Sequence, residues 1–190
     1  MFAPRLLAVG LALLVDACAP LLVNSYLETG ADMTRYRTYR WASHEGEATG
    51  DPRLDNNPFF DATTRAAVDR ALAGKGLEAT AGAADLVLRF HISIKQQLDL
   101  GGTDSPYLGC DGCSPTVYEA GTLVVDAVEA RTNRLLWRAW AEGSFDRVID
   151  DQAALERRIE EAVARIMARY PVTRALEKEG HYDSRTRSHR

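Results

Sequence analysis

The sequence is poor in the residues that define fibrous, low-complexity and disulfide-rich proteins. Its 190 residues include only 14 Gly, 7 Pro and 3 Cys, whereas 46% are hydrophobic and 26% are charged. So little glycine and proline excludes a collagen-like chain, and the hydrophobic fraction excludes a wholly disordered one. A chain of this length buries about 70% of its unfolded surface, so one ordinary domain needs no disulfide lattice or structural metal to fold.

The chain also lacks a strong charge of one sign and a long hydrophobic run. Lysine and arginine number 23 against 27 acidic residues, a net charge of -4. This balance offers no field that would attract a phosphate backbone, so we expect no nucleic-acid partner. The small and apolar run at the amino end, residues 6–15, has ten residues. Because a membrane-spanning helix needs about 20, a polytopic membrane protein is excluded.

The amino end has the pattern of an export signal. Arg5 precedes the apolar run, and the small residue Ala17 stands where a signal peptidase reads its cleavage site. The stretch Leu14-Val15-Asp16-Ala17-Cys18 resembles the bacterial lipobox, although Asp16 occupies a position that is usually small and uncharged. That resemblance implies cleavage after residue 17 and a diacylglycerol on the sulfur of Cys18. Several acyl chains on one cysteine suffice for stable anchoring.

Two other interpretations of the amino end stay open. Residues 6–23 would form an uncleaved anchor only at the cost of placing Asp16 near the middle of the bilayer, about 2.5 kcal/mol or more, with Pro20 disturbing the helix. Alternatively, cleavage releases a soluble periplasmic protein and Cys18 has no lipid. The lipid-anchored form is favoured. Ala19 then lacks the aspartate that commonly retains lipoproteins in the inner membrane, which favours the periplasmic side of the outer membrane.

The remaining cysteines, Cys110 and Cys113, are expected to form a disulfide in an oxidising compartment. Their Cys-x-x-Cys spacing has two further interpretations, a thiol-redox pair and half of a zinc site. Redox enzymes place such a thiol at a helix start, and no helix is predicted after Cys113. Tetrahedral zinc needs four ligands, and the sequence offers no second cysteine pair. A small disulfide staple in a loop is therefore favoured.

The hydrophobic periodicity predicts an α+β fold. Apolar residues alternate in four stretches and recur at helical spacing in two. The strands are expected at residues 36–41, 86–95, 122–129 and 135–143, and the helices at 61–73, capped by Asp61, and 151–170. Loops are expected at 43–58 and 97–116. The order strand, helix, three strands, helix favours a two-layer sandwich, a four-stranded sheet with both helices on one face.

The last two predicted strands form a hairpin around a three-residue turn, Thr132 to Arg134, with Asn133 left-handed. This turn places Val125 opposite Ala141 and Ala127 opposite Ala139.

The same register sets Asp126 opposite Trp140 and diagonal to Arg138. The acid and the arginine then form a structural ion pair, which is favoured, or a substrate-binding pair. Trp137 is expected in the core, and Trp140 beside Leu136 on an uncovered face suited to protein contact.

From about residue 24 to 171 the chain resembles the DUF4136 family of bacterial envelope lipoproteins. No single piece carries the resemblance; it lies in the order and spacing of several short motifs. They are Asp32 with Tyr36-Arg37-Thr38-Tyr39-Arg40-Trp41, Asn57-Pro58 before Asp61, Ala84-Asp85-Leu86, Gly121-Thr122-Leu123-Val124-Val125-Asp126, Ala130-Arg131-Thr132-Asn133 and Trp137-Arg138-Ala139-Trp140-Ala141. The resemblance implies an envelope domain behind a lipoprotein signal and assigns no catalytic or binding residue. The Cys110–Cys113 loop is not part of the family pattern.

These observations predict a signal peptide at residues 1–17, a lipid-anchored tether at 18–30, one α+β envelope domain at 31–171 and a flexible tail at 172–190. The sequence has no phosphate-binding glycine loop with lysine, no His-Glu-x-x-His and no serine nucleophile elbow. We therefore expect no enzymatic activity and no cofactor. The predicted function is a lipid-anchored protein that binds or scaffolds other envelope proteins. The alternative is a periplasmic thiol-redox or metal-binding module that uses Cys110 and Cys113.

Overall fold

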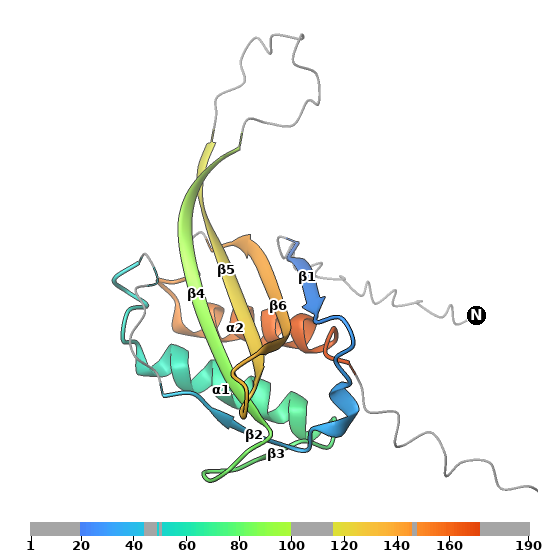
Figure 1. The fold of residues 1–190 in the computed structure, drawn as a ribbon. Helices are drawn as coiled ribbons and strands as arrows, with labels where there is room; N and C mark the ends of the chain where they lie inside the picture. The colour runs from blue at the N-terminus through green and yellow to red at the C-terminus, as the bar shows by residue number, and fades with distance from the viewer. Residues whose placement is uncertain (1–19, 44–48, 50, 100–115, 146–147, 172–190) are drawn as a thin grey trace, which may run out of the picture.

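The computed structural model describes residues 20–43, 49, 51–99, 116–145 and 148–171. They form one six-stranded mixed sheet and two helices, and Figure 1 shows both helices lying behind the sheet. The elements are β1 Leu22–Leu27, η1 Met33–Arg35, β2 Thr38–Trp41, α1 Pro58–Ala73, β3 Glu78–Ala79, β4 Leu86–Asp99, β5 Thr116–Glu129, β6 Leu135–Ser144 and α2 Gln152–Met167. The strand order is β1-β6-β5-β4-β2-β3. Strand β2 runs parallel to both of its neighbours, and the other pairs are antiparallel.

The α+β class is confirmed, but the expected four strands understate the sheet. Strand β1 lies in the stretch predicted as a tether, and all six of its residues pair with β6. It shows no alternation because only Val23 among its residues is partly buried. Strand β3 has two exposed residues, too few for a periodic signal. Both additional strands lie at the edges of the sheet, where the hydrophobic pattern weakens.

The core lies between the helices and one face of the sheet. The predicted alternation of β4 is confirmed, because Leu86, Leu88, Phe90, Ile92 and Ile94 are all buried. The predicted stripe of the second helix is confirmed as well, and its members are at most 3% exposed: Leu155, Ile159, Val163, Ile166 and Tyr170. These side chains belong to one hydrophobic cluster that also contains Val68 and Leu72 of α1.

Helix α1 begins three residues earlier than predicted. Asn57, not Asp61, is its N-cap, and the Asn57 side chain accepts hydrogen bonds from the backbone N–H groups of Phe59 and Phe60. Pro58 occupies the first turn, where its fixed φ suits a helix start. Asp61 lies in that turn and pairs with Arg65 at 2.8 Å. The expected cap was wrong because Asn57 already supplies the acceptor that these amides need.

The β5–β6 hairpin differs from the predicted register by two residues. Val125 lies opposite Ala139, and Ala127 lies opposite Trp137. The ladder closes with Glu129 N–H donating to the Arg134 carbonyl, so the turn contains four residues, 130–133, instead of three. A bulge at Ala127/Val128 then moves the pairing by one residue, back toward the predicted register. The predicted left-handed Asn133 is confirmed, with φ of 56°.

Strands β4 and β5 pair beyond the rest of the sheet. Their ladder continues to Asp99 opposite Thr116, whereas β6 stops at Ser144 opposite Ala120. The end of this ladder projects as a two-stranded ribbon in Figure 1. The loop predicted at 97–116 is therefore too long at both ends, because backbone pairing continues where the sequence has lost its alternation.

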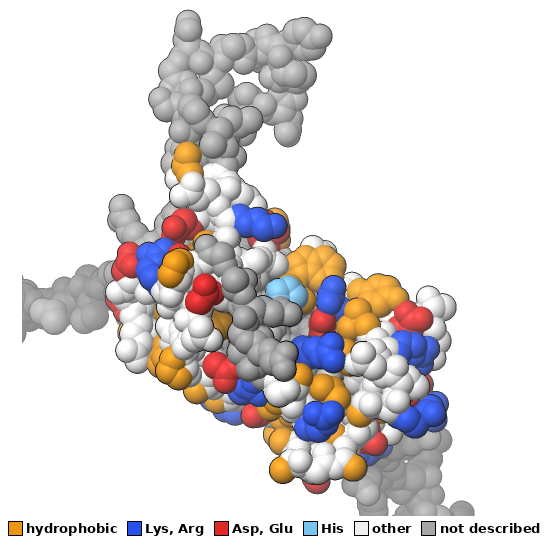
Figure 2. Space-filling model, turned by 60° about the vertical axis from the view of Figure 1, so that its left-hand side comes forward, with side chains coloured by type: hydrophobic (Ala, Val, Ile, Leu, Met, Phe, Trp, Pro, Cys, Tyr) orange, Lys and Arg blue, Asp and Glu red, His pale blue; other side chains and the backbone are white. Residues whose placement is uncertain are grey.

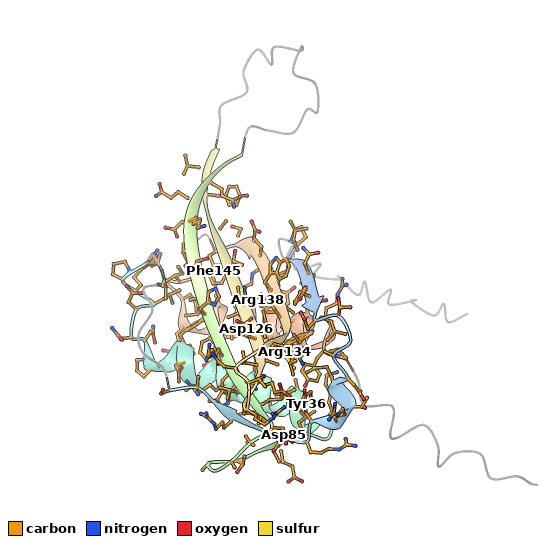
Figure 3. All side chains as sticks on the ribbon, in the orientation of Figure 1. Tyr36, Asp85, Asp126, Arg134, Arg138 and Phe145 are labelled. Atoms are coloured by element: carbon orange, nitrogen blue, oxygen red, sulfur yellow. The ribbon has the colours of Figure 1, made fainter. Side chains whose placement is uncertain are left out.

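Asp85 joins the beginnings of β2 and β4, near the lower end of the sheet in Figure 3. Its carboxylate accepts hydrogen bonds from the backbone N–H groups of Arg37 at 2.8 Å and Thr38 at 3.0 Å, and from the Thr38 hydroxyl at 3.1 Å. These donors favour the charged form and lower the pKa of Asp85 below its usual range. The bonds hold β2 in parallel pairing with β4.

We expect Asp85→Ala to lower the free energy of unfolding by about 1 kcal/mol at neutral pH, because the two amides lose an exposed acceptor. A group whose pKa is lowered by folding stabilises above its unfolded pKa of about 3.9, and the stabilisation disappears as the pH falls through the folded value. The gap between wild type and variant should therefore shrink below about pH 4. Urea unfolding across pH measures it. Asp85→Asn keeps an acceptor oxygen without titrating, so its difference from Asp85→Ala should not depend on pH. A difference between wild type and Asp85→Ala that is equally independent of pH would contradict the assignment.

Candidate binding groove

A polar hollow of about 490 Å³ opens where β2 ends and β4 continues. It lies beside the part of the sheet that the helices leave open, and four strands, β2, β4, β5 and β6, contribute to it together with α1. Figure 2 shows basic side chains interspersed with hydrophobic ones on one side of the molecule. We call this hollow the arginine groove. The residues that line it are Trp41, Ala42, Ser43, Arg65, Leu88, Arg89, Phe90, His91, Asp126 and Arg138.

An ion pair between β5 and β6 forms one wall of the groove. Arg138 Nε and Nη2 each donate to a different oxygen of Asp126 at 2.6 Å, a bidentate arrangement. The residues lie directly opposite each other, side by side in Figure 3. The Asp126 side chain is 11% exposed and that of Arg138 43%. The carboxylate raises the pKa of Arg138, so this guanidinium stays charged.

The opposite wall is an arginine stacked on aromatic rings. The guanidinium carbon of Arg65 lies 4.9 Å from the ring centroid of Trp41 and 5.7 Å from that of Phe90. The two rings meet edge to face at 5.7 Å. The Trp41 indole N–H donates to Asp69 Oδ1 at 3.0 Å, an oxygen that also accepts from the Tyr39 hydroxyl at 2.7 Å. These contacts join β2 to α1 and orient the rings.

Arg89 and His91 of β4 complete the lining. Arg89 donates to the side-chain oxygen of Asn133 at 3.0 Å, which links the groove to the β5–β6 turn. His91 also borders a second, smaller hollow of about 240 Å³, whose other lining residues include Asn57 and Phe60 of the α1 start. The His91 side chain is half-buried and lies on the polar side of β4, as the alternation of the strand predicts.

The groove presents guanidinium donors, one carboxylate, an imidazole and aromatic surface. Planar guanidinium groups bind carboxylates and phosphates, and aromatic faces stack on flat or apolar ligand surfaces. No group of three or more His, Cys, Asp or Glu suited to a metal ion occurs among the residues that the structure describes. The side chains of the lining can hold a ligand by hydrogen bonds, charge and stacking.

The structure tests only some of the predicted site residues. Cys18, Cys110 and Cys113 lie outside the described residues. Asp126 and Arg138 do come together, but directly opposite each other rather than diagonally, because the register differs.

The two tryptophans of β6 face opposite sides of the sheet, as the sequence predicts. Trp137 is 1% exposed in the core, and Trp140 is half-buried on the open face. Leu136 was expected beside Trp140 on the uncovered face, which is wrong: it is fully buried in the core cluster. At the bulge, β6 has an extra residue at this position, which breaks the alternation.

Sequence reasoning missed Arg65 and Arg89 as lining residues. Arg65 lies on α1, which is separated from β4 in the sequence by β3 and its connecting loops. Nothing in the sequence around Arg65 indicates that it stacks on Trp41. Arg89 carries a weak signal, since it alternates onto the same strand face as His91 and lies opposite Asp126. That signal becomes visible only when the pairing of β4 with β5 is known.

The sequence matches the model of one protein family, described as a domain of unknown function (DUF4136), over residues 23–172. The chain belongs to the DUF4136 family. The match includes the described sheet except Leu22, the first residue of β1, and it confirms the resemblance seen in the motifs. No curated protein matches this DUF4136 chain.

Three solved structures are similar to this DUF4136 protein. A PDZ domain protein from Parabacteroides distasonis has 14% identity and a TM-score of 0.54, and the match covers 80% of this chain and 36% of that one. A DUF4136 family protein from Bacteroides thetaiotaomicron has 15% identity, a TM-score of 0.49 and coverage of 80% and 97%. A PelC dodecamer from Paraburkholderia phytofirmans has 12% identity, a TM-score of 0.43 and coverage of 79% and 99%. At these identities the first likeness shows a shared fold alone.

Proposed function

We propose that this DUF4136 protein is a lipid-anchored component of the bacterial envelope, held by acyl chains on Cys18 at the periplasmic side of the outer membrane. Its domain binds or scaffolds another envelope component through the arginine groove and catalyses no reaction. The observation that carries the proposal is the position of the lipobox-like cysteine, four residues before the first strand of the sheet. Among the described residues, no helix is long and apolar enough to cross a membrane.

The groove supports a binding role because each of its guanidinium groups is held in place by a neighbouring side chain. Arg138 is paired with Asp126, Arg65 is paired with Asp61 and stacked on Trp41, and Arg89 is bonded to Asn133. Such prearranged side chains lose little conformational freedom when a ligand binds. The lining holds neither cysteine nor lysine, and its only hydroxyl is that of Ser43. A partner bearing acidic or hydroxyl groups suits this lining best.

The decisive test of the anchor compares the native protein with Cys18→Ser. We expect the wild-type mature chain to begin at Cys18, to carry the mass of its acyl chains and to fractionate with the outer membrane. Cys18→Ser should lose the acyl mass and appear in soluble fractions. Intact-mass measurement of both proteins decides the matter. A wild-type chain that still begins at Met1, or that lacks acyl mass, would overturn the anchor.

The groove is tested in the same cells by crosslinking. Arg89→Glu reverses a charge on the lining, and Arg157→Glu makes the same change at an exposed position of α2, away from the groove. We expect a crosslinked partner to be lost from Arg89→Glu and retained by Arg157→Glu. Equal capture by the two variants would exclude the groove as the contact site.

The alternative module with Cys110 and Cys113 depends on residues outside those described. The β4–β5 ladder ends at Asp99 and Thr116, so the segment with both cysteines joins β4 to β5 in the sequence. Titration of the two thiols in protein taken from the periplasm, with and without reductant, distinguishes the functions. A disulfide that forms and breaks within the physiological range of potentials would favour the redox module.

A further inference from the structure

Exposed large hydrophobic side chains concentrate on β1. Four such residues occur in the described part of the chain, and three belong to this strand: Leu22, Tyr26 and Leu27, which are 66%, 45% and 44% exposed. The fourth, Val117, is 56% exposed on the distant ribbon. Isolated exposed residues of this kind are ordinary, whereas a group on one strand indicates a contact surface.

Strand pairing extends this surface onto β6. Asn24 lies directly opposite Trp140, so the side chains of Leu22 and Tyr26, two residues to either side of Asn24, share the sheet face of Trp140. This is the face opposite the helices, and Arg138 lies opposite Tyr26 on it. We call Leu22, Tyr26 and Trp140 the β1 patch; Leu27 lies opposite Trp137 and belongs to the other face. The patch is an aliphatic and aromatic strip bordered by Arg138, which is paired with Asp126, and by Glu142, which lies opposite Leu22.

The short connection from Cys18 determines what this patch can meet. Four peptide units separate Cys18 from Leu22, so their Cα atoms lie at most about 14 Å apart. Acyl chains on Cys18 would hold that residue at the level of the lipid headgroups. The six residues of β1 span about 20 Å, so a strand that lies along the surface keeps both Leu22 and Tyr26 within reach of the headgroups.

We propose that the β1 patch is a membrane-contact surface that enters the interfacial layer of the leaflet holding the acyl chains. This inference rests on the proposed lipidation of Cys18. Tryptophan and tyrosine favour the interface because their rings are apolar and their N–H or O–H groups remain hydrated. Leu22 supplies apolar area, and the contact would bring Arg138, opposite Tyr26, to the level of the lipid phosphates. The contact fixes the orientation of the domain and keeps the arginine groove, which shares Arg138, beside the leaflet.

Quenching of tryptophan fluorescence by brominated lipid tests the proposal. Acylated protein is reconstituted into vesicles of phosphatidylethanolamine and phosphatidylglycerol, with bromine on the upper part of some acyl chains. We expect the emission of the wild type to fall relative to vesicles without bromine. In a Trp41→Phe background, which removes the third tryptophan, Trp140→Phe should lose this quenching, because the remaining Trp137 is buried in the core. Leu22→Ser with Tyr26→Ser should reduce it, whereas Val117→Ser, the same change at an exposed residue far from β1, should leave it unchanged.

The possible results distinguish a failure of the proposed anchor from a failure of the proposed membrane contact. A wild-type chain without acyl mass overturns the anchor and this inference together. Acylated protein whose Trp140 is not quenched overturns the inference alone. Absence of quenching together with a dimer that Leu22→Ser dissociates would instead show that a second copy covers the patch, which also overturns it. Light scattering of the same samples in detergent reports the oligomeric state.

Discussion

Replacing Trp137 with alanine is expected to lower the free energy of unfolding by about 3–5 kcal/mol. Trp137 is 1% exposed and is the largest of the fully buried side chains. Its ring meets that of Tyr170 edge to face at 4.9 Å, and that contact packs the turn after α2 onto β6. Alanine would lose this contact and leave a cavity that the surrounding sheet and helix cannot fill. Urea unfolding followed by circular dichroism measures the loss.

Trp140 provides the matched control for this prediction. It lies on the same strand, three residues away, but is half-buried on the face without helices. We expect Trp140→Ala to cost well under half as much as Trp137→Ala, because less of its surface leaves water on folding. A Trp140→Ala variant at least as destabilised as Trp137→Ala would contradict the placement of the two faces. The same pair also separates stability from membrane contact, for which only Trp140 is required.

The sequence predicts the core of this protein well because burial imposes a period. The alternation of β4, the stripe of α2 and the inward direction of Trp137 each follow from one face that must leave water. Periodicity does not depend on which strands are neighbours, so it survives an incorrect strand count. The order of the sheet and its parallel β2–β4 pair have no such local signal.

The errors occur where backbone hydrogen bonding, rather than side-chain burial, decides the structure. The β5–β6 register depends on whether the turn has three or four residues. The turn has four because Glu129 pairs with Arg134. Glu129 accepts hydrogen bonds from the hydroxyls of Thr132, within the turn, and Tyr36, 93 residues earlier in the chain. The second contact is tertiary. Edge strand β1 likewise exists because β6 offers a free edge, although its own side chains are mostly exposed.

The motifs that reveal the family are largely motifs of the fold. Asn57 caps α1, Asp85 joins β2 to β4, and Asn133 takes the left-handed position of the turn. The groove draws on this set through Trp41, Asp126 and Arg138, whereas Arg65, Arg89 and His91 lie outside the quoted motifs. The resemblance therefore predicts the architecture far better than the ligand. The part of the lining that the motifs omit, which includes Arg65, Arg89 and His91, is where differences in binding between family members are expected.

The second large effect is expected at Gly121, which the ring of Phe145 covers. A Cβ atom at Gly121 would lie 2.2 Å from Cδ2 and 2.4 Å from Cε2 of that ring, far inside van der Waals contact. Phe145 is 4% exposed, and its backbone N–H donates to the Glu119 carbonyl at 2.8 Å, so it cannot withdraw without breaking strand pairing. We expect Gly121→Ala to lower the free energy of unfolding by about 1–3 kcal/mol through overpacking.

Two comparisons show whether the Phe145 ring is the cause of this loss. Gly82→Ala adds the same methyl group in open surroundings, where the nearest neighbouring atom, Thr80 Oγ1, is 3.9 Å away, so we expect a change within about 0.5 kcal/mol. In a Phe145→Ala background, the ring is gone and the cost of Gly121→Ala should nearly disappear. The double-mutant cycle isolates that coupling, because the two side chains are in direct contact. Additive losses would mean that the strand backbone, rather than the ring, requires glycine at this position.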